Sequence, residues 1–420
     1  MSASPTAPAR VPASPAQLAV DTSRTHAHAL DGMRALAALM VIALHTGIYS
    51  GQVASSWLGI GHGGALGPVL SRFTVGVPIF FVLSGLLLYR PYANAGRDGA
   101  PRPPTGRYLW HRALRILPAY WAVTLVALAA FTPDALTHLW ATVRPLALLH
   151  IYQANVIPAG ITQTWSLATE ASFYVLLPLL ALALHPLLRR PAAVLVALGA
   201  LEAVSVASVV LTHLPSAGPY PAAGFWLPQY IGYFAAGMAL AVLASRGAGL
   251  GALARHPWAC WGVAVAAYAV ESTPLTGSTS VYPTVPQALL QHLLDLVVAV
   301  ALVAPLVLRT ERGPARLLSH RVPARLGRIS YAVFLWHMVV VETFLRLTGE
   351  PAGSATFAVL FPATVAVTVL IAVASDILIE RPARRLRRST AVTPRSTRDD
   401  QPEPVTALGG QPPAARDGAA

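Results

Sequence analysis

Apolar side chains fall into ten long stretches along the 420-residue chain, and the basic residues lie between them. Stretches of about 17–25 apolar residues are long enough to cross the hydrocarbon core of a bilayer as an α-helix. We therefore expect an all-α fold, a polytopic membrane bundle of about ten transmembrane helices. The expected spans lie at about 30–49, 70–89, 113–131, 165–184, 192–212, 226–245, 257–272, 286–308, 329–346 and 355–378.

One further apolar run, at about 138–156, is interrupted by Arg144, Pro145, His150 and Asn155. These residues argue against a simple span, so we expect an interfacial or re-entrant segment. Backbone of that kind is tolerated at membrane depth only where protein buries it or where it faces a wet cavity.

The composition supports the membrane interpretation, because 55% of residues are hydrophobic and only 11% are charged. A soluble protein carries about 25% charged residues. The net charge of +13 would suggest nucleic acid in a soluble protein, but here orientation in the membrane explains it and no nucleic acid is expected. The single cysteine, Cys260, excludes an internal disulfide and a thiolate metal site, and no metal is predicted.

The 30 basic side chains, all arginine, indicate the topology. With the N-terminus in the cytoplasm, all of them except Arg72, Arg144 and Arg346 fall on inside segments, as the positive-inside rule requires. We expect a multi-pass protein of the inner or plasma membrane with both termini cytoplasmic. Residues 29–385 would form the transmembrane domain, and 1–28 and 386–420 disordered tails.

Arg34 and His45 share one face of the first span, because eleven residues make about three helical turns. Asp31, three residues before Arg34, can pair with it. In a functional interpretation, Arg34 holds an anion at the cytoplasmic mouth while His45 acts as a general base deeper in the membrane. Otherwise Arg34 snorkels to the interface and His45 bonds to a neighbouring helix. Intramembrane ionisable residues usually mark functional sites, which favours function for His45 and not for Arg34 alone.

Arg112 and Arg115 stand one turn apart at the expected start of the third span. A fixed pair of guanidiniums at a membrane face can hold the phosphates of an acyl carrier. By spacing alone, the simpler explanation is favoured, that they are two ordinary positive-inside charges. Glu170, near the outer start of the fourth span, either orients a histidine or acceptor hydroxyl, or is an interfacial acid favoured by the helix dipole. Trp165 would be an interfacial anchor.

Three further features have simpler interpretations. His337 lies about two turns into the ninth span and should face the bundle. Ser84 and Gly85 should let two helices approach closely. Glu380 should form a salt bridge with a nearby arginine.

Five segments, in this order, resemble the acyltransferase-3 family of membrane O-acyltransferases: LDGMRALAALMVIALH, VPIFFVLSGLLLYR, RYLWHRALRILPAYW, TWSLATEASFY and LGRISYAVFLWH, with IERPARR closing. The similarity covers about residues 30–385. It implies transfer of an acyl group, commonly acetyl, from cytoplasmic acyl-CoA to a hydroxyl of a cell-surface glycan, glycolipid or macrolide-like metabolite. The family's arginine-to-histidine pattern falls on Arg34 and His45, and its paired-arginine motif on Arg112 and Arg115.

This chain departs from the family pattern at two places. It has Pro78 where the family often has an acid, and Glu170 is followed by Ala171 where the family often has a second acid. The resemblance predicts acyl-CoA bound by Arg34, Arg112 and Arg115, with His45 as the base and Glu170 orienting His45 or the acceptor.

Two other classes of function remain open from the residues. A transporter or flippase, proton-coupled through His45 and Glu170, would also place ionisable groups in the membrane. A non-catalytic scaffold for envelope assembly is the third alternative, against which the intramembrane His45 and His337 argue. The arginine pair favours the enzyme, because transport needs no cytoplasmic site for acyl-CoA.

Overall fold

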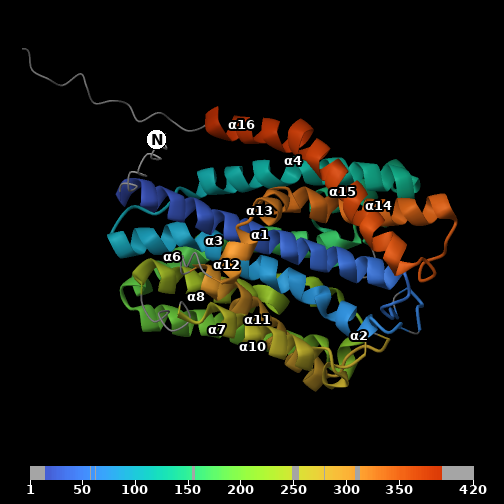
Figure 1. Ribbon diagram of the computed structural model, residues 1–420, viewed down its shortest axis with the longest axis horizontal. Coiled ribbons are helices and arrows are strands. Elements are labelled where there is room, and N and C mark those ends of the chain that lie inside the picture. The colour runs from blue at the N-terminus through green and yellow to red at the C-terminus, as the bar shows by residue number, and fades with distance from the viewer. Residues whose placement is uncertain are drawn as a thin grey trace, which may run out of the picture.

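Long apolar helices that run side by side make up most of the computed structural model (Figure 1). It describes residues 15–56, 58–61, 63–153, 157–247, 255–278, 280–307 and 313–389. Over this part of the chain, the β contacts amount to one isolated bridge between Ser55 and Ile60. The predicted all-helical membrane fold is confirmed.

Nine helical segments in the described part are long and apolar enough to cross a membrane, which makes this a multi-pass membrane protein. They contain α1 (Pro15–Tyr49), α3 (Gly76–Asp98), α4 (Thr105–Phe131), α6 (Trp165–Leu184), α7 (Pro191–Thr212), α8 (Leu227–Arg246), α11 (Val285–Val307), α14 (Ser330–Thr348) and α15 (Phe357–Ser375). Each corresponds to a span expected from the apolar pattern.

The remaining expected span, at 257–272, has the predicted bounds to within one residue but is too short to cross a bilayer. It forms α10 (Pro257–Glu271), whose 15 residues extend about 22 Å at 1.5 Å per residue. A bilayer core is about 30 Å thick, so α10 alone does not qualify as a full span. It packs along α11, where the indole of Trp261 donates a hydrogen bond to the carbonyl of Leu302.

The described part of the interrupted run, 138–153, does not form a span, as predicted, and 154–156 lie outside the described residues. It folds into the short helix α5 (Leu139–Leu146) and a 3₁₀ turn at His150–Tyr152. Two side chains of α4 hold it: the Tyr120 hydroxyl donates to the carbonyl of Pro145, and the Trp121 indole to that of Leu146. The backbone polar groups of this segment therefore find partners within the protein.

The ends of the described chain are more helical than expected. α1 begins at Pro15, so residues 15–28 of the predicted tail are part of this helix, while 1–14 lie outside the described residues. At the other end, a π-turn at Asp376–Glu380 leads into α16 (Arg381–Ser389), and 390–420 lie outside the described residues. Arg384 bonds Glu380 at 3.3 Å, which confirms the predicted salt bridge.

Glycines allow the most extensive helix contact of the described bundle, between α3 and α8. A Cβ at Gly85 would clash with the carbonyl of Phe234, and one at Gly237 with the carbonyl of Val82. The close approach predicted from Ser84–Gly85 is therefore confirmed, and small residues again serve helix packing in a membrane. The short helices α2 (Gly67–Leu70), α12 (Pro314–Leu318) and α13 (Arg321–Arg328) pack against α1.

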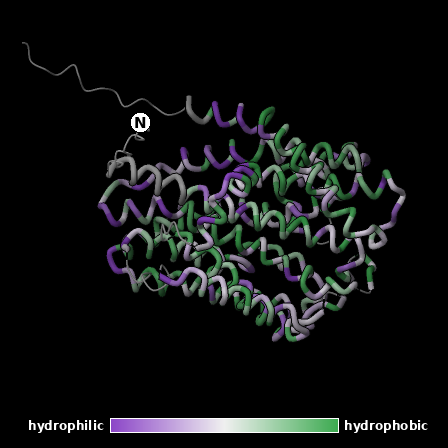
Figure 2. Tube along the Cα trace, in the orientation of Figure 1, coloured by the Kyte–Doolittle hydropathy of each residue, from purple (hydrophilic) through white to green (hydrophobic). Residues whose placement is uncertain are grey.

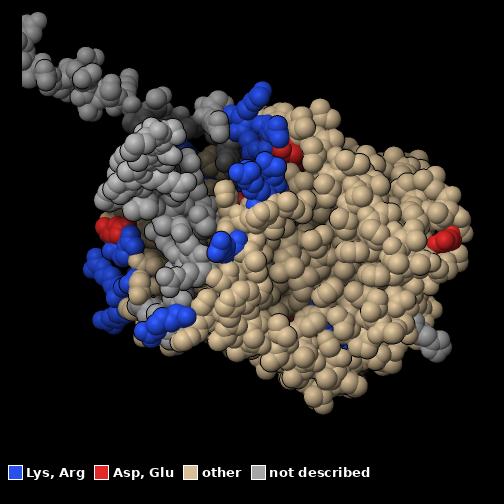
Figure 3. Space-filling model, viewed as in Figure 1, with Lys and Arg blue, Asp and Glu red and all other residues tan. Residues whose placement is uncertain are grey.

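Polar and charged residues gather at one end of the bundle. Figure 2 shows apolar residues along the length of the helices, and Figure 3 shows arginines clustered towards the end where α1 begins. The opposite end of the face in Figure 3 carries no arginine cluster. The molecule is therefore electrostatically polarised along its helices.

Candidate active site

A cavity of about 640 Å³ lies around the C-terminal end of α1, away from the arginine-rich end. We call it the histidine cavity. His45 and Tyr49 of α1 line it together with Glu342 of α14 and the start of α6 at Trp165. Its mixture of apolar walls and a few convergent polar groups is typical of a small-molecule site.

His45 and His337 meet across α1 and α14, and their hydrogen bonds fix both tautomers. His45 Nδ1 lies 2.8 Å from the carbonyl of Val41, and His337 Nδ1 lies 2.7 Å from that of Phe334. A carbonyl oxygen only accepts, so each Nδ1 carries the proton and each Nε2 is left with a lone pair. His337 Nε2 also faces His45 Nδ1 at 3.3 Å as a second acceptor.

These bonds leave His45 Nε2 free to take a proton from a group in the histidine cavity. The ring is half-buried and lines the cavity, whereas His337 behind it is completely buried. An imidazole whose far nitrogen is held by backbone and a neighbouring ring is oriented as a general base.

A carboxyl group that the sequence analysis overlooked lies in the same cavity. The Tyr49 hydroxyl donates a 2.7 Å hydrogen bond to Glu342 Oε1. Tyr49 is one turn beyond His45 on α1, so the pair sits beside the histidines. The sequence signal that could have indicated Glu342 was an acid within an otherwise apolar span, because such a residue is costly in a membrane unless it serves a functional site.

His150, which the sequence indicated only as an interruption of the run at 138–156, also lines the cavity. Its Nε2 lies 3.2 Å from the Thr164 hydroxyl, and it is fully buried although it comes from the short turn after α5. Burial lowers the pKa of His150 to about 4, so this imidazole is neutral at physiological pH.

A second, narrower space of about 50 Å³ lies closer to the arginine-rich end, and we call it the arginine cleft. It is lined by Arg34, Arg115, Glu170 and Tyr174, with Ser330 and Phe334 of α14. Arg34 is within electrostatic range of both Arg115 and Glu170. The predicted meeting of Arg34 and Arg115 at one site is therefore observed.

Glu170 belongs to the arginine cleft and not to the histidine pair. Its carboxylate accepts a hydrogen bond from the Ser84 hydroxyl, and it lies among Arg34, Arg115 and Tyr174. The bonds given for His45 go to Val41 and His337. The expectation that Glu170 orients His45 has no support in this arrangement, because α6 turns the carboxylate towards α3.

Arg112 and Arg115 lie two turns inside α4, which begins at Thr105, and not at its start as expected. Arg115 is exposed and lines the arginine cleft, whereas Arg112 is half-buried and interacts electrostatically with Tyr108 and Tyr174. The Nε atoms of Arg34 and Arg112 are buried without a hydrogen-bond partner. Buried donors of this kind are suited to an anionic ligand.

Aromatic rings separate the two spaces. Phe80 and Phe334 both line the arginine cleft, with ring centroids 6.3 Å apart. Phe334 also contacts His337, at 6.0 Å between centroids. Trp165 packs on Phe225, with 5.3 Å between ring centroids, and lines the histidine cavity; its position at a membrane interface stays a prediction.

Comparison with known proteins covers both sites. The acyltransferase-3 family model, described as an acyltransferase domain, matches residues 27–375. The exopolysaccharide production protein ExoZ of Rhizobium meliloti (strain 1021) is 28% identical over 344 residues, 77% of this chain and 94% of ExoZ. No solved structure matches the chain significantly. The matched range contains every histidine, arginine and acid named above for the two sites.

Proposed function

The chain belongs to the acyltransferase-3 family, and we propose that it transfers an acyl group, commonly acetyl, from cytoplasmic acyl-CoA to a hydroxyl of a cell-surface glycan. The observation that carries this proposal is the His45–His337 pair, which leaves a basic nitrogen facing a cavity large enough for a sugar. Acyl transfer to a hydroxyl needs such a base.

In the proposed reaction, His45 Nε2 takes the proton of the acceptor hydroxyl as its oxygen attacks the thioester carbon. The carbon–sulfur bond then breaks, and His45 returns the proton to the departing CoA thiolate. The ester and free CoA are the products, so atoms and charge balance. During transfer, His337 Nε2 accepts from His45 Nδ1 and stabilises the imidazolium. A positioned base of this kind contributes about 10²–10⁴-fold to the rate.

The donor would enter from the arginine-rich end. Phosphates would bind the guanidinium of Arg115, with Arg112 and Arg34 adding positive potential. The cleft itself, at about 50 Å³, suits a narrow pantetheine arm and not a nucleotide. Since Arg34 and His45 are eleven residues apart on one helix, the arm would reach roughly 16 Å into the bundle, past Phe334.

The orientation that we propose for the protein in the membrane follows from the clustering of arginines at one end of the bundle. Cytoplasmic segments of membrane proteins are rich in arginine, so we assign the arginine-rich end, with both termini, to the cytoplasm. The histidine cavity then opens on the outer side, where a cell-surface acceptor is found. A glycan acceptor is favoured because ExoZ, the relative above, is named for exopolysaccharide production. Lipid-linked glycans and macrolide-like metabolites carry the same hydroxyl chemistry.

Charge reversal of Arg115 tests the donor site. In Arg115→Glu, the acetyl-CoA concentration needed for half-maximal thiol release should rise about tenfold or more, because a charge-assisted bond to phosphate is lost. Arg189→Glu, an exposed arginine beyond α6, makes the same change of net charge outside the cleft. It should leave the acetyl-CoA requirement unchanged.

If both variants needed the same acetyl-CoA concentration for half-maximal thiol release, Arg115 would have no role in donor binding and would only set the membrane orientation. The rival transporter makes a different prediction, because it needs no acyl-CoA site. For a transporter, acetyl-CoA would fail to raise the melting temperature of the wild-type protein in nanodiscs. For the enzyme, it should protect wild type and protect Arg115→Glu less.

A further inference from the structure

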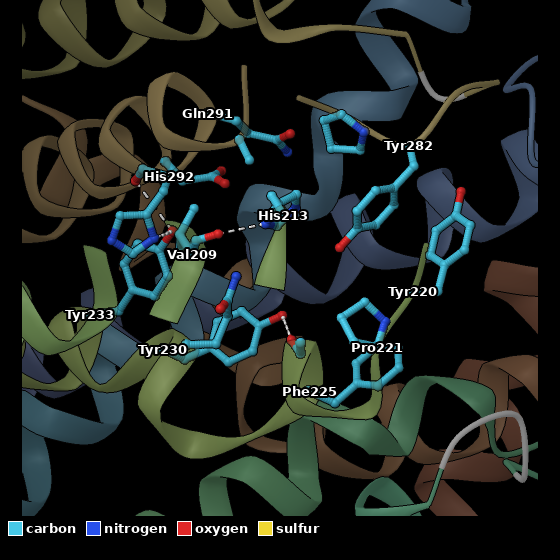
Figure 4. A pocket seen from close by; sticks show the side chains of 15 residues that line it. Val209, His213, Tyr220, Pro221, Phe225, Tyr230, Tyr233, Tyr282, Gln291 and His292 are labelled. Carbon is cyan, nitrogen blue, oxygen red and sulfur yellow. Dashed lines mark hydrogen bonds between the residues drawn. The ribbon is translucent and has the colours of Figure 1, made fainter. Parts of the chain in front are cut away.

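A second compartment adjoins the histidine cavity and has not been used by the proposed reaction. It has a volume of about 230 Å³ and lies among α7, α8, α11 and the loops that precede α8 and α11 (Figure 4). Tyr220, Phe225, Pro283 and Gln291 line both spaces. We call it the tyrosine annex. Because its walls are shared, a ligand in the histidine cavity can extend into it.

The annex is walled by aromatic rings that are held in place. Figure 4 shows Tyr220 and Tyr282 side by side, with centroids 4.9 Å apart. His213 stacks on the other side of Tyr282, at 4.9 Å and an interplanar angle of 8°. The Tyr282 hydroxyl donates to the carbonyl of Thr212. Rings fixed in this way offer flat apolar faces at little entropic cost.

Polar groups on the opposite wall are fixed by a hydrogen-bonded chain. The Tyr233 hydroxyl lies 2.9 Å from His292 Nδ1, and His292 Nε2 lies 2.9 Å from Glu202 Oε1. Both Gln229 and Gln291 use their side-chain oxygens as acceptors, from Ser208 and Arg72 respectively. Their amide nitrogens have no hydrogen bond to the described protein in these pairings and remain available as donors.

Asp295 supplies the observation that points to a ligand. Its side chain lines the annex, the residue is only 6% exposed, and its Oδ1 has no hydrogen-bond partner in the described structure. A buried carboxyl oxygen without a partner is costly. A ligand hydroxyl in the annex would satisfy it.

The chemistry of the annex restricts the class of ligand. None of the described residues that line it is an arginine, so a phosphate or CoA finds no counter-charge there. An acyl chain would leave the amide nitrogens of Gln229 and Gln291 and the Oδ1 atom of Asp295 without partners. Flat rings opposite hydrogen-bonding side chains instead match a sugar, which has apolar C–H faces and a rim of hydroxyls.

We propose that the tyrosine annex binds the sugar next to the one that is acylated, so that the acceptor is a neutral oligosaccharide or polysaccharide segment and not a lone sugar. This inference rests on the proposed function, because it assumes that the sugar to be acylated lies beside His45. The aromatic wall that Tyr220 and Tyr282 form packs against the neighbouring ring, and Asp295 accepts from one of its hydroxyls.

The test compares acceptors of different length on the full-length protein in nanodiscs. Acetyl-CoA turnover is read as free thiol with glucose, cellobiose or cellotetraose, after subtraction of the rate without acceptor. Wild type should have a kcat/KM about tenfold higher for cellobiose than for glucose, as expected for one well-placed aromatic contact. In Tyr282→Ala, this ratio should fall to about one. Tyr282→Phe keeps the ring and should keep the ratio.

A binding measurement separates this proposal from the proposed function. Cellotetraose without any donor should raise the melting temperature of wild type and Tyr282→Phe, but not of Tyr282→Ala. If this pattern appeared without thiol release, it would support sugar binding in the annex and contradict the proposed acyltransferase activity. Thiol release with equal kcat/KM for glucose and cellobiose, or a ratio unaffected by Tyr282→Ala, would overturn the annex alone. Absence of both turnover and protection would overturn both.

Discussion

At the scale of single residues, the two histidines of the site are held by the same kind of hydrogen bond. In both rings, Nδ1 donates to a backbone carbonyl of the ring's own helix, three or four residues earlier. This bond selects the tautomer without help from a carboxylate, and it leaves His337 Nε2 as an acceptor for His45. In the proposed reaction, His337 would therefore be a positioning residue, which acts on the substrate through His45.

Substitution of His337 should affect turnover and not donor binding. His337→Leu removes the acceptor facing His45, and kcat should fall about 10–100-fold, as for other groups that orient a functional histidine. The KM for acetyl-CoA should stay as in wild type. His337→Gln restores an acceptor and should recover part of kcat. Equal kcat values in His337→Leu and wild type would make His337 a packing residue.

The buried His150 should make the protein less stable in acid. Its pKa is about 4 in the folded state, against about 6.5 when unfolded, so the unfolded chain binds the extra proton between these values. Stability should be fully present above pH 7 and fall as the pH drops towards 4. From pH 7 to 4.5, the loss due to His150 is about 2 kcal/mol.

Thermal unfolding in nanodiscs across this pH range measures the effect. His150→Gln keeps a partner for Thr164 and should flatten the acid side of the profile. The matched substitution His320→Gln, at an exposed position between α12 and α13, should leave the profile as in wild type. A profile that is the same in all three proteins would contradict the burial argument.

At the scale of elements, the contact between α3 and α8 depends on the absence of side chains. Gly85→Ala places a methyl group against the carbonyl of Phe234, and overpacking of this kind costs about 1–3 kcal/mol. Gly199→Ala, on α7, meets nothing within 4 Å and should be neutral or stabilising, since alanine favours the helix. Thermal unfolding should rank Gly199→Ala at or above wild type and Gly85→Ala below it.

The elements themselves were largely predictable from sequence, for a physical reason. In a bilayer, every backbone polar group of a span must be satisfied within the segment, so long apolar runs have few alternatives to helices. Nine expected spans are candidate spans in the structure, and the interrupted run at 138–156 was recognised as an exception. The short α10 was not: its bounds match the expected stretch to within one residue, but its 15 residues are too few to cross the bilayer core.

Contacts between distant elements were not predictable in the same way. His45 and His337 are 292 positions apart in the sequence, and neither segment contains a pattern that indicates the other as its partner. The depth of Glu170 was likewise misjudged, because its position near the start of α6 suggested the outer side, whereas tilt and packing bring it to Ser84 and Arg115. By contrast, Arg34 and His45 were correctly separated, since one helix fixes their spacing.

At the scale of the whole molecule, the bundle has two unlike ends. Arginines gather at one end around the narrow arginine cleft, and the histidine cavity with its tyrosine annex occupies the other. Phe80 and Phe334 of the cleft and the histidine pair lie between these two ends, with Phe334 in contact with both Phe80 and His337. Under the proposed function, this arrangement would let a charged donor and a polar acceptor approach from opposite ends of the bundle.

The most direct test of this account is acetyl-CoA turnover by the purified protein in nanodiscs, read as free thiol in the presence of cellotetraose, with wild type beside His45→Ala. The account predicts thiol release by wild type and a fall of about 100-fold or more in His45→Ala. Protection by acetyl-CoA against unfolding should be equal in the two proteins. Turnover by folded His45→Ala at the wild-type rate would contradict the account.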